Sequence, residues 1–184
     1  MEKSGQPWQT VRHRYVYRNP HRSFVVEGGR TRDGAETDYA YMEAPAAVLV
    51  VPLTGDGQLV LVRQYRIPVR EWVWEVPAGG VGDEAPEAAA RRELAEEVGG
   101  TCAELQAVGW WYGLPSAVNS QHYLYFASGV ELDESHHEPA ELMEIARIPA
   151  DQALDWARSG EIRSAESAYA LLRCEPLIRQ HLRG

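Results

Sequence analysis

An acidic helix that follows a glycine-rich loop is the feature that most constrains how this chain can fold. Residues 87–100 read "EAAARRELAEEVGG", and the preceding residues read "PAGGVGDE". At 100° per residue, Ala90, Leu94 and Val98 fall on one apolar stripe that can be buried. This periodicity predicts a helix from about Glu84 to Val98, which the two following glycines end.

The carboxylates of this helix are crowded on another face. Glu93 and Glu97 are four residues apart, and Glu96 lies beside them. Like charges at this spacing destabilise a helix by a few tenths of a kcal/mol, and the helix dipole disfavours anions near the C-terminal end. Arg92 can relieve part of the repulsion by pairing with Glu96. Two interpretations remain open: a divalent cation that bridges Glu93 and Glu97, or a solvated acidic face.

The loop before the helix favours a ligand site. Its glycines let backbone amides approach a ligand closely, and amides at a helix N-terminus attract phosphate oxygens. Neither the dinucleotide fingerprint G-x-G-x-x-G nor the Walker pattern G-x-x-x-x-G-K-[ST] is present in it.

Strand patterns dominate the rest of the chain. Short strands are expected between Trp8 and Ala47, followed by a hairpin of "AAVLVVPL" and "QLVLVRQYR" around the turn "TGDG". "WVWEVPAGG", "ELQAVGWWYG", "QHYLYFASGVEL" and "LMEIARIP" read as further strands. Helical spacing returns in residues 150–157. Ser164 is expected to cap a last helix with an apolar face of Ala168, Leu171 and Leu172. The order predicts a mixed α/β (α+β) body with a small N-terminal β-sheet.

Composition excludes several function classes. The net charge of -9 argues against non-specific nucleic-acid binding and is compatible with divalent cations. Cys102 and Cys174 have no metal-finger spacing and read as buried thiols in a reducing compartment. No secretory signal and no run of eighteen apolar residues is visible, so the expectation is a cytoplasmic protein with no nucleic-acid or membrane partner.

Residues 79–100 resemble the box of the Nudix hydrolases. That family's pattern is Gly, five residues, Glu, seven residues, then Arg-Glu-apolar-x-Glu-Glu-x-Gly-apolar, and here Glu84 is followed after seven residues by "RELAEEVG". Two positions depart from it: only four residues separate Gly79 from Glu84, and Gly100 replaces an apolar residue.

"LVLVRQYR", "WEVPAG" and "IPADQALDWARSGEI" are similar to the ADP-ribose pyrophosphatase branch of this family. The resemblance implies a Nudix fold, in which a mixed β-sheet lies between helices. It also implies a small antiparallel subdomain at residues 1–46, exchanged across a homodimer, and a hydrolase domain at residues 47–184.

The resemblance also implies site roles. Glu93, Glu96 and Glu97 match the box carboxylates that ligate Mg²⁺, with Mn²⁺ as an alternative, and the carbonyl of Ala78 matches a further ligand. Arg92 matches the arginine that orients these glutamates, and Glu84 is expected to be its structural partner. Gly79 and Gly80 are expected to approach the substrate.

Outside the box the expected roles are less direct. A carboxylate of the loop "DESHHEPAE", Glu138 or Glu141, is the candidate general base, and Glu141 also a candidate metal ligand, while a solvated acidic loop is the alternative. Arg66 is a candidate phosphate ligand or a structural ion pair. Ser116 begins "SAVNSQ", the place of the loop that touches the terminal sugar in this branch, but the Pro-Gly and Ser-Asp-Glu usual there are absent.

The expected function is cation-dependent hydrolysis of a nucleoside diphosphate sugar, with ADP-ribose giving AMP and ribose 5-phosphate as the leading case. The alternatives are GDP-mannose or another nucleotide sugar, a dinucleoside polyphosphate, or a non-catalytic nucleotide sensor. Four tryptophans, at positions 72, 74, 110 and 111, are expected to serve packing rather than base stacking.

Overall fold

The computed structural model describes residues 7–133 and 143–183. The described chain forms two compact units. The first contains residues up to Pro45 together with 112–121, and the second contains 46–111 and the residues from 122 onward.

The first unit is built on a three-stranded antiparallel sheet. Its strands are β1 (Trp8–Arg18), β2 (Ser23–Thr31) and β3 (Glu36–Glu43), and β2 pairs with both neighbours. The predicted short strands are therefore present, and the first begins at Trp8. This sheet is the small antiparallel sheet expected from the sequence.

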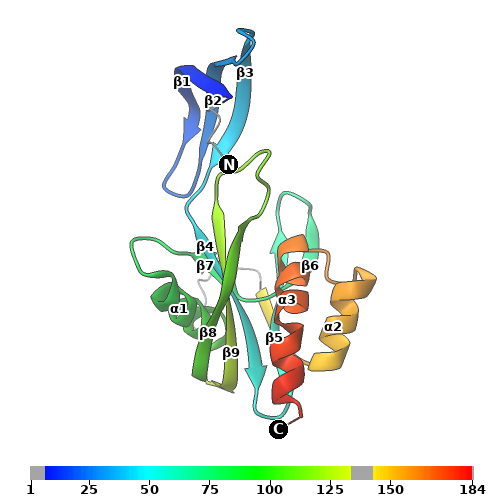
Figure 1. Cartoon of the computed structure of the whole chain (residues 1–184). Coiled ribbons are helices and arrows are strands. Elements are labelled where there is room, and N and C mark those ends of the chain that lie inside the picture. The colour runs from blue at the N-terminus through cyan, green and yellow to red at the C-terminus, as the bar shows by residue number, and fades with distance from the viewer. Residues whose placement is uncertain (1–6, 134–142, 184) are drawn as a thin grey trace, which may run out of the picture. The chain divides into compact units, whose positions relative to one another are not determined.

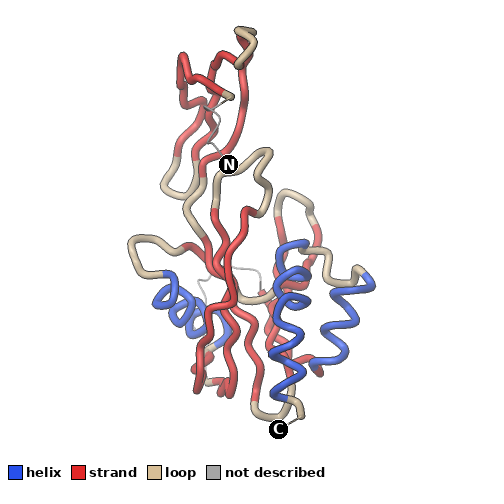
Figure 2. The backbone as a smooth tube through the Cα atoms, in the orientation of Figure 1, coloured by secondary structure: helices blue, strands red, loops and turns tan. Residues whose placement is uncertain are grey.

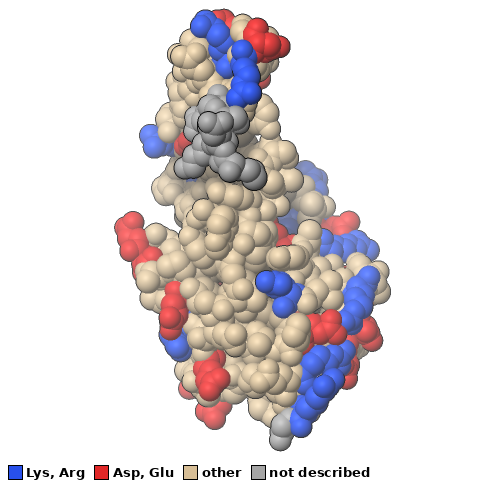
Figure 3. All heavy atoms as spheres, viewed as in Figure 1, with Lys and Arg blue, Asp and Glu red and all other residues tan. Residues whose placement is uncertain are grey.

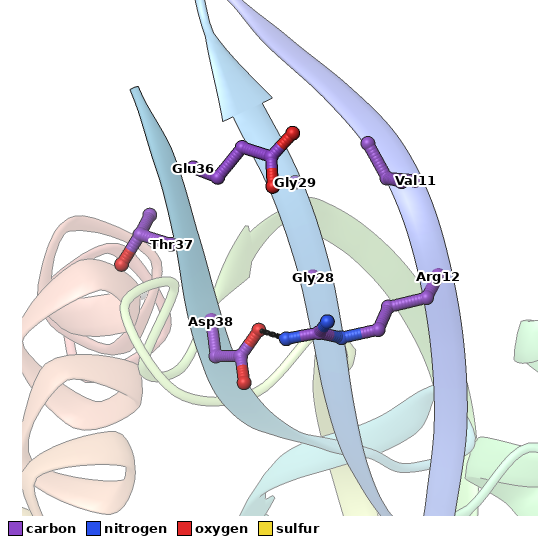
Figure 4. Close-up of a pocket in the computed structure, with 7 residues that line it drawn as sticks. All are labelled: Val11, Arg12, Gly28, Gly29, Glu36, Thr37 and Asp38. Carbon is purple, nitrogen blue, oxygen red and sulfur yellow. Dashed lines mark hydrogen bonds and ion pairs between the residues drawn. The ribbon is translucent and has the colours of Figure 1, made fainter. Parts of the chain in front are cut away.

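One face of this small sheet carries paired charges. The guanidinium of Arg12, on β1, crosses over Gly28 of β2 to form an ion pair with Asp38 of β3, as Figure 4 shows. A side chain at position 28 would collide with Arg12, because an added Cβ would lie 2.5 Å from its Nε. The glycine therefore makes room for a charge pair that spans three strands.

The second unit is a mixed sheet between helices (Figures 1 and 2). In the described residues of this unit the strand order is β10-β5-β4-β9-β8, with β6 paired to β5 and β7 paired to β4. The strands are β4 (Ala47–Thr54), β5 (Gln58–Arg66), β6 (Glu71–Glu75), β7 (Ala78–Gly80), β8 (Gly100–Tyr112), β9 (Gln121–Leu132) and β10 (Met143–Pro149).

The predicted hairpin of β4 and β5 differs in its pairing. The turn is present, Gly57 adopts a positive φ of 81° there, and β4 and β5 are antiparallel neighbours, but their residues are paired only at Leu53 and Leu59. Along its length β4 pairs instead with β9, in parallel, and its first residues pair with β7. The reason is that β4 is a central strand, buried on both faces. Its partners β7 and β9 therefore come from distant parts of the sequence.

Alternate residues of the central strands pack into two separate cores. Leu49, Val51 and Leu53 of β4 join one hydrophobic cluster, whereas Val48 and Val50 join the other. β5 and β9 alternate in the same way. Because successive side chains of a strand point to opposite faces, one apolar run serves both helical layers.

Helix α1 (Pro86–Val98) covers one face of the sheet. The predicted stripe is buried, with Ala90, Leu94 and Val98 at most 1% exposed. The helix begins two residues later than predicted, since the residue before a proline avoids the helical region and Ala85 is extended. It ends as predicted, at Gly99, in the left-handed conformation.

Helices α2 (Ala150–Ser159) and α3 (Ala165–His181) cover the other face. Ser164 caps α3 as predicted, because its side chain accepts a hydrogen bond from the Ser167 amide. The expected apolar face is confirmed at Leu171, which is fully buried, and at Ala168, which packs against the core, but it is wrong at Leu172, which is 37% exposed. The buried positions of α3 are Ser167, Ala170, Leu171, Cys174 and Ile178.

The outer surfaces of α2 and α3 carry interleaved charges, visible in Figure 3. Arg158 and Arg179 each form ion pairs with Glu175, and Arg179 also pairs with Asp151. The pairs Arg158–Glu175 and Arg179–Asp151 join the two helices, whereas Arg179–Glu175 lies within α3. Exposed pairs of this kind each contribute little to stability.

Candidate functional site

The acidic residues of α1 fall into two environments. Glu93 and Glu97 are 8% and 9% exposed, whereas the side chain of Glu96 is 53% exposed. Two carboxylates are therefore buried against the protein, which a solvated acidic face does not explain. Burying a charge is costly unless other groups compensate it.

Arg92 provides much of that compensation. Its guanidinium donates to Glu84 Oε1 at 2.8 Å, Glu93 Oε1 at 2.7 Å and Glu96 Oε2 at 2.8 Å. It also donates to the carbonyl oxygen of Gly80 at 2.8 Å. The expected pairings of Arg92 with Glu84 and Glu96 are thus present, and the same side chain joins the loop to the helix.

The charge of Arg92 is strongly held. The hydrogen bond that Arg92 donates to Glu84 is the largest cause that raises the pKa of Arg92 above its ordinary value. Burial opposes the increase, and the hydrogen bonds to Glu96 and Glu93 add to it. Arg92 therefore remains a cation at any pH at which the protein is folded.

The strand β7 approaches the helix closely. The amide of Ala78 donates to Glu97 Oε2 at 2.9 Å. At the next residue, a Cβ added to Gly79 would lie 2.1 Å from the carboxyl carbon and Oε1 of Glu93. Any larger residue at position 79 would displace the Glu93 carboxylate from its observed place. This close contact is the physical reason for a glycine at this position.

The chemistry of these side chains suits a hard divalent cation. Carboxylate oxygens are the ligands that Mg²⁺ and Mn²⁺ prefer, and a carboxylate has about four lone-pair sites, of which one hydrogen bond uses one. Glu93 and Glu97 are held beside the backbone of Ala78, so residues of the expected ligand set lie together. Over residues 7–133 and 143–183, no three His, Cys, Asp or Glu side chains converge as a metal-binding group.

Arg66 forms an ion pair with Glu75, one of the two interpretations left open by the sequence. Its Nε lies 3.1 Å from both carboxylate oxygens of Glu75, and its Nη2 contacts Oε2. Burial acts to lower the pKa of Arg66, but Glu75, followed by the charges of Glu97 and Glu166, raises it. Arg66 is thus a stable cation whose charge is felt by Glu97. Its ion pair with Glu75 leaves it near the buried carboxylate.

Ser116 belongs to the first unit. Its carbonyl accepts a hydrogen bond from the Tyr39 hydroxyl at 2.5 Å, and the neighbouring Ala117 carbonyl accepts one from the Met42 amide at 2.8 Å. The segment is therefore fixed to β3. Gly80, in contrast, belongs to the second unit with the box.

The tryptophans divide between packing and exposure. Trp74 lies 5.5 Å from Trp156, and Trp111 lies 4.8 Å from Tyr169, both between ring centroids. Trp72 and Trp110 are 40% and 55% exposed, and the ring of Trp72 lies 5.8 Å from that of Tyr65. Glu138 and Glu141, the candidate bases, lie outside the described residues.

Sequence reasoning missed two contacts that build this site. One is the bond from the Ala78 amide to Glu97, and the other is the bond from the Val76 amide to the Ser167 hydroxyl at 3.2 Å. Both join residues that are far apart in sequence. The glycine at position 79 indicated that another group lies close to the backbone. No local pattern could identify that group as the Glu93 carboxylate.

A sheet between helices, with buried carboxylates and an arginine beside a glycine-containing loop, is an arrangement that suits a hydrolase of phosphoric anhydrides. A model of the NUDIX domain matches residues 43–169. The chain therefore belongs to the Nudix family, and it is a pyrophosphohydrolase of the type that resembles ADP-ribose pyrophosphatases.

Similar proteins include curated relatives and solved structures. The ADP-ribose pyrophosphatase of Bacillus subtilis (strain 168) is 30% identical over 149 residues, which is 79% of this chain and 80% of that protein. A GDP-mannose pyrophosphatase of Enterobacter sp. (strain 638) is 27% identical over 124 residues, covering 61% and 64%. A crystal structure of an ADP compounds hydrolase has the same fold, with a TM-score of 0.83, 22% identity, and coverage of 99% and 100%.

The Nudix fold expected from the sequence is thus confirmed. As for membranes, the helices in the described ranges include none with the length and apolar character needed to span one.

Proposed function

We propose that this protein hydrolyses the pyrophosphate bond of a nucleoside diphosphate sugar, and that ADP-ribose, cleaved to AMP and ribose 5-phosphate, is its leading substrate. The observation that carries the proposal is the set of two buried glutamates, Glu93 and Glu97, held by Arg92 and the Ala78 amide. The resemblance to ADP-ribose pyrophosphatases supports the choice of substrate.

The roles of the residues follow from charge. A diphosphate carries clustered anionic oxygens, so an acidic site binds it only when cations lie between the two. Glu93, Glu96, Glu97 and the Ala78 carbonyl would hold Mg²⁺ or Mn²⁺, which lowers the pKa of water and neutralises phosphate charge when bound. Arg92 keeps Glu93 and Glu96 oriented.

Other groups complete the proposal. Arg66 is the candidate for a phosphate contact, since its cation lies near Glu97. Gly79 and Gly80 are candidates for backbone contacts to the substrate, and nothing lies within 4 Å of a Cβ added at Gly80. Ser116 is a candidate contact to the sugar, and Glu138 or Glu141 is the candidate base that accepts a proton from water.

Replacing Glu97 by Gln tests the metal assignment. The amide removes the negative charge while keeping the shape, so the rate should fall on the order of a thousandfold or more if Glu97 ligates the cation. The measurement is release of AMP from ADP-ribose over a series of Mg²⁺ concentrations. An unchanged rate would show that Glu97 is not a ligand.

A second candidate substrate is GDP-mannose, because GDP-mannose pyrophosphatases are among the similar proteins. A panel of nucleotide sugars and dinucleoside polyphosphates, with the products identified by mass, separates the candidates. Nucleotide binding without turnover in Mg²⁺ or Mn²⁺ would support a non-catalytic sensor instead, although the retained glutamates argue against it.

We also propose that the protein is a homodimer formed through the first unit, residues 1–46 being exchanged between copies. An open apolar cavity of about 670 Å³ lies in this unit, and Val16, Phe24 and Leu114 beside it are 58%, 47% and 56% exposed. Exposed apolar patches of this kind mark interaction surfaces. Analytical ultracentrifugation should show a dimer that Phe24→Glu dissociates, with Ile67→Glu in the second unit as the control.

A further inference from the structure

The first turn of α3 is fixed against the strand segment that reaches the box. The hydroxyl of Ser167, which is 2% exposed, accepts a hydrogen bond from the Val76 amide at 3.2 Å. Two residues after Val76, the Ala78 amide donates to Glu97. This path places the start of α3, and with it Glu166, at a defined position relative to the buried carboxylate of α1.

Glu166 lies beside a buried histidine. Its Oε1 lies 3.5 Å from Nδ1 of His122, whose side chain is 11% exposed and packs edge-on against the ring of Trp111. That nitrogen is buried and has no hydrogen-bond partner within the described part of the chain. The Glu166 side chain itself is 47% exposed. One side of the carboxylate therefore faces a fixed ring, and the rest is accessible to a ligand.

The charges around Glu166 restrict what that ligand group can be. The carboxylates of Glu166 and Glu97 both lie near enough to Arg66 to stabilise its cation. Arg66 is the candidate phosphate contact, so Glu166 is positioned beside the place of a phosphate. A carboxylate repels phosphate oxygens but accepts hydrogen bonds from hydroxyl groups, as acidic residues do from ribose in dinucleotide sites.

We propose that Glu166 binds vicinal hydroxyls of the terminal sugar of the substrate, and that His122 is a positioning residue that holds its carboxylate. This inference rests on the proposed function, since it requires a nucleoside diphosphate sugar in the site. It gives the chain a specificity determinant in α3, outside the Nudix box. The competing explanation is structural: an acidic residue in the first turn of a helix stabilises the helix dipole.

Two substrates and one variant distinguish these explanations. The full-length protein with Mg²⁺ is assayed on ADP-ribose and on an ADP ester that carries a plain alkyl chain in place of the terminal ribose. Glu166→Gln should raise KM for ADP-ribose about tenfold or more, because a charged hydrogen bond to a hydroxyl is lost, with little change in kcat. The same variant should leave KM for the alkyl ester unchanged.

The controls separate positioning from folding. Glu161→Gln, an exposed glutamate between α2 and α3, should change neither KM. His122→Phe keeps a ring against Trp111 but removes Nδ1, so it should raise KM for ADP-ribose by a smaller factor than Glu166→Gln and leave the alkyl ester unaffected. A His122→Phe variant that behaves as wild type would remove the positioning role.

Different results would overturn the sugar contact and the proposed hydrolase function. Equal effects of Glu166→Gln on both substrates, or no effect on either, would overturn the sugar contact while leaving the hydrolase function intact. Failure of the wild-type protein to cleave either substrate would overturn the ADP-ribose proposal and the sugar contact with it.

Discussion

At the scale of the residue, the close approach of Gly79 to Glu93 links backbone geometry to function. The two groups belong to β7 and α1, and an added Cβ at position 79 would lie 2.1 Å from the Glu93 carboxyl group. The atoms in its way are the end of a flexible side chain. The fold can therefore accommodate the change, but the carboxylate cannot keep its position.

Gly79→Ala should consequently lower activity far more than stability. Displacing a reacting or metal-holding group by about 1 Å costs on the order of a hundredfold in rate. The measurement is kcat/KM for ADP-ribose, together with the urea midpoint. Gly55→Ala is the matched control, because nothing lies within 4 Å of a Cβ added at position 55. Unchanged kcat/KM in Gly79→Ala would mean that the position of Glu93 does not matter for turnover.

At the scale of the element, hydrogen bonds between distant segments decide where the site forms. The buried hydroxyl of Ser167 on α3 accepts a hydrogen bond from the amide of Val76, which lies between β6 and β7. An unsatisfied buried amide costs about 1–3 kcal/mol.

Ser167→Ala should therefore lower the free energy of unfolding by about 1–3 kcal/mol. Chemical denaturation followed by circular dichroism measures the change. Ser159→Ala, at an exposed serine of α2, is the control and should shift the midpoint little. If Ser167→Ala were as stable as the control, the Val76 amide would have to find another partner.

The elements also show what the sequence could and could not predict. Apolar periodicity located α1 and α2, the bounds of β9 were read directly from "QHYLYFASGVEL", and Gly99 marked the end of α1. Local sequence patterns could not predict features that depend on tertiary packing. Two examples are the parallel pairing of β4 with β9 and the exposure of Leu172.

The sequence likewise predicted only part of the candidate site. The box pattern identified Arg92 and the glutamates, because their spacing lies within one helix. It could not reveal that Glu75 pairs with Arg66, or that Glu166 and His122 meet, since these contacts join residues from different elements.

At the scale of the whole molecule, buried acids with raised pKa values predict a loss of stability at alkaline pH. Burial raises the pKa of the Cys174 thiol from 9.0 to about 12. Burial, followed by the charge of Glu27, raises the pKa of the Tyr41 hydroxyl from 10.0 to about 12. The folded protein holds both protons more tightly than the unfolded chain does.

Unfolding in this range releases protons, so the free energy of unfolding should be fully present below about pH 9 and fall as the pH rises toward 12. Urea midpoints measured between pH 8 and pH 11.5 check this. The slope should be shallower in Cys174→Ala, whatever its stability at neutral pH, and in Tyr41→Phe. Tyr17→Phe, at a tyrosine that is 55% exposed, should retain the wild-type slope. A midpoint independent of pH would contradict the raised pKa values of both groups.

Because residues of β4, β5 and β9 alternate between two hydrophobic clusters, the two helical layers pack on opposite faces of the same strands. Inserting or deleting a single residue within β4 would exchange the side chains that face α1 with those that face α3. Length changes inside these strands should thus be far rarer among related sequences than size changes of their apolar residues, and natural variation in chain length should concentrate in the turns.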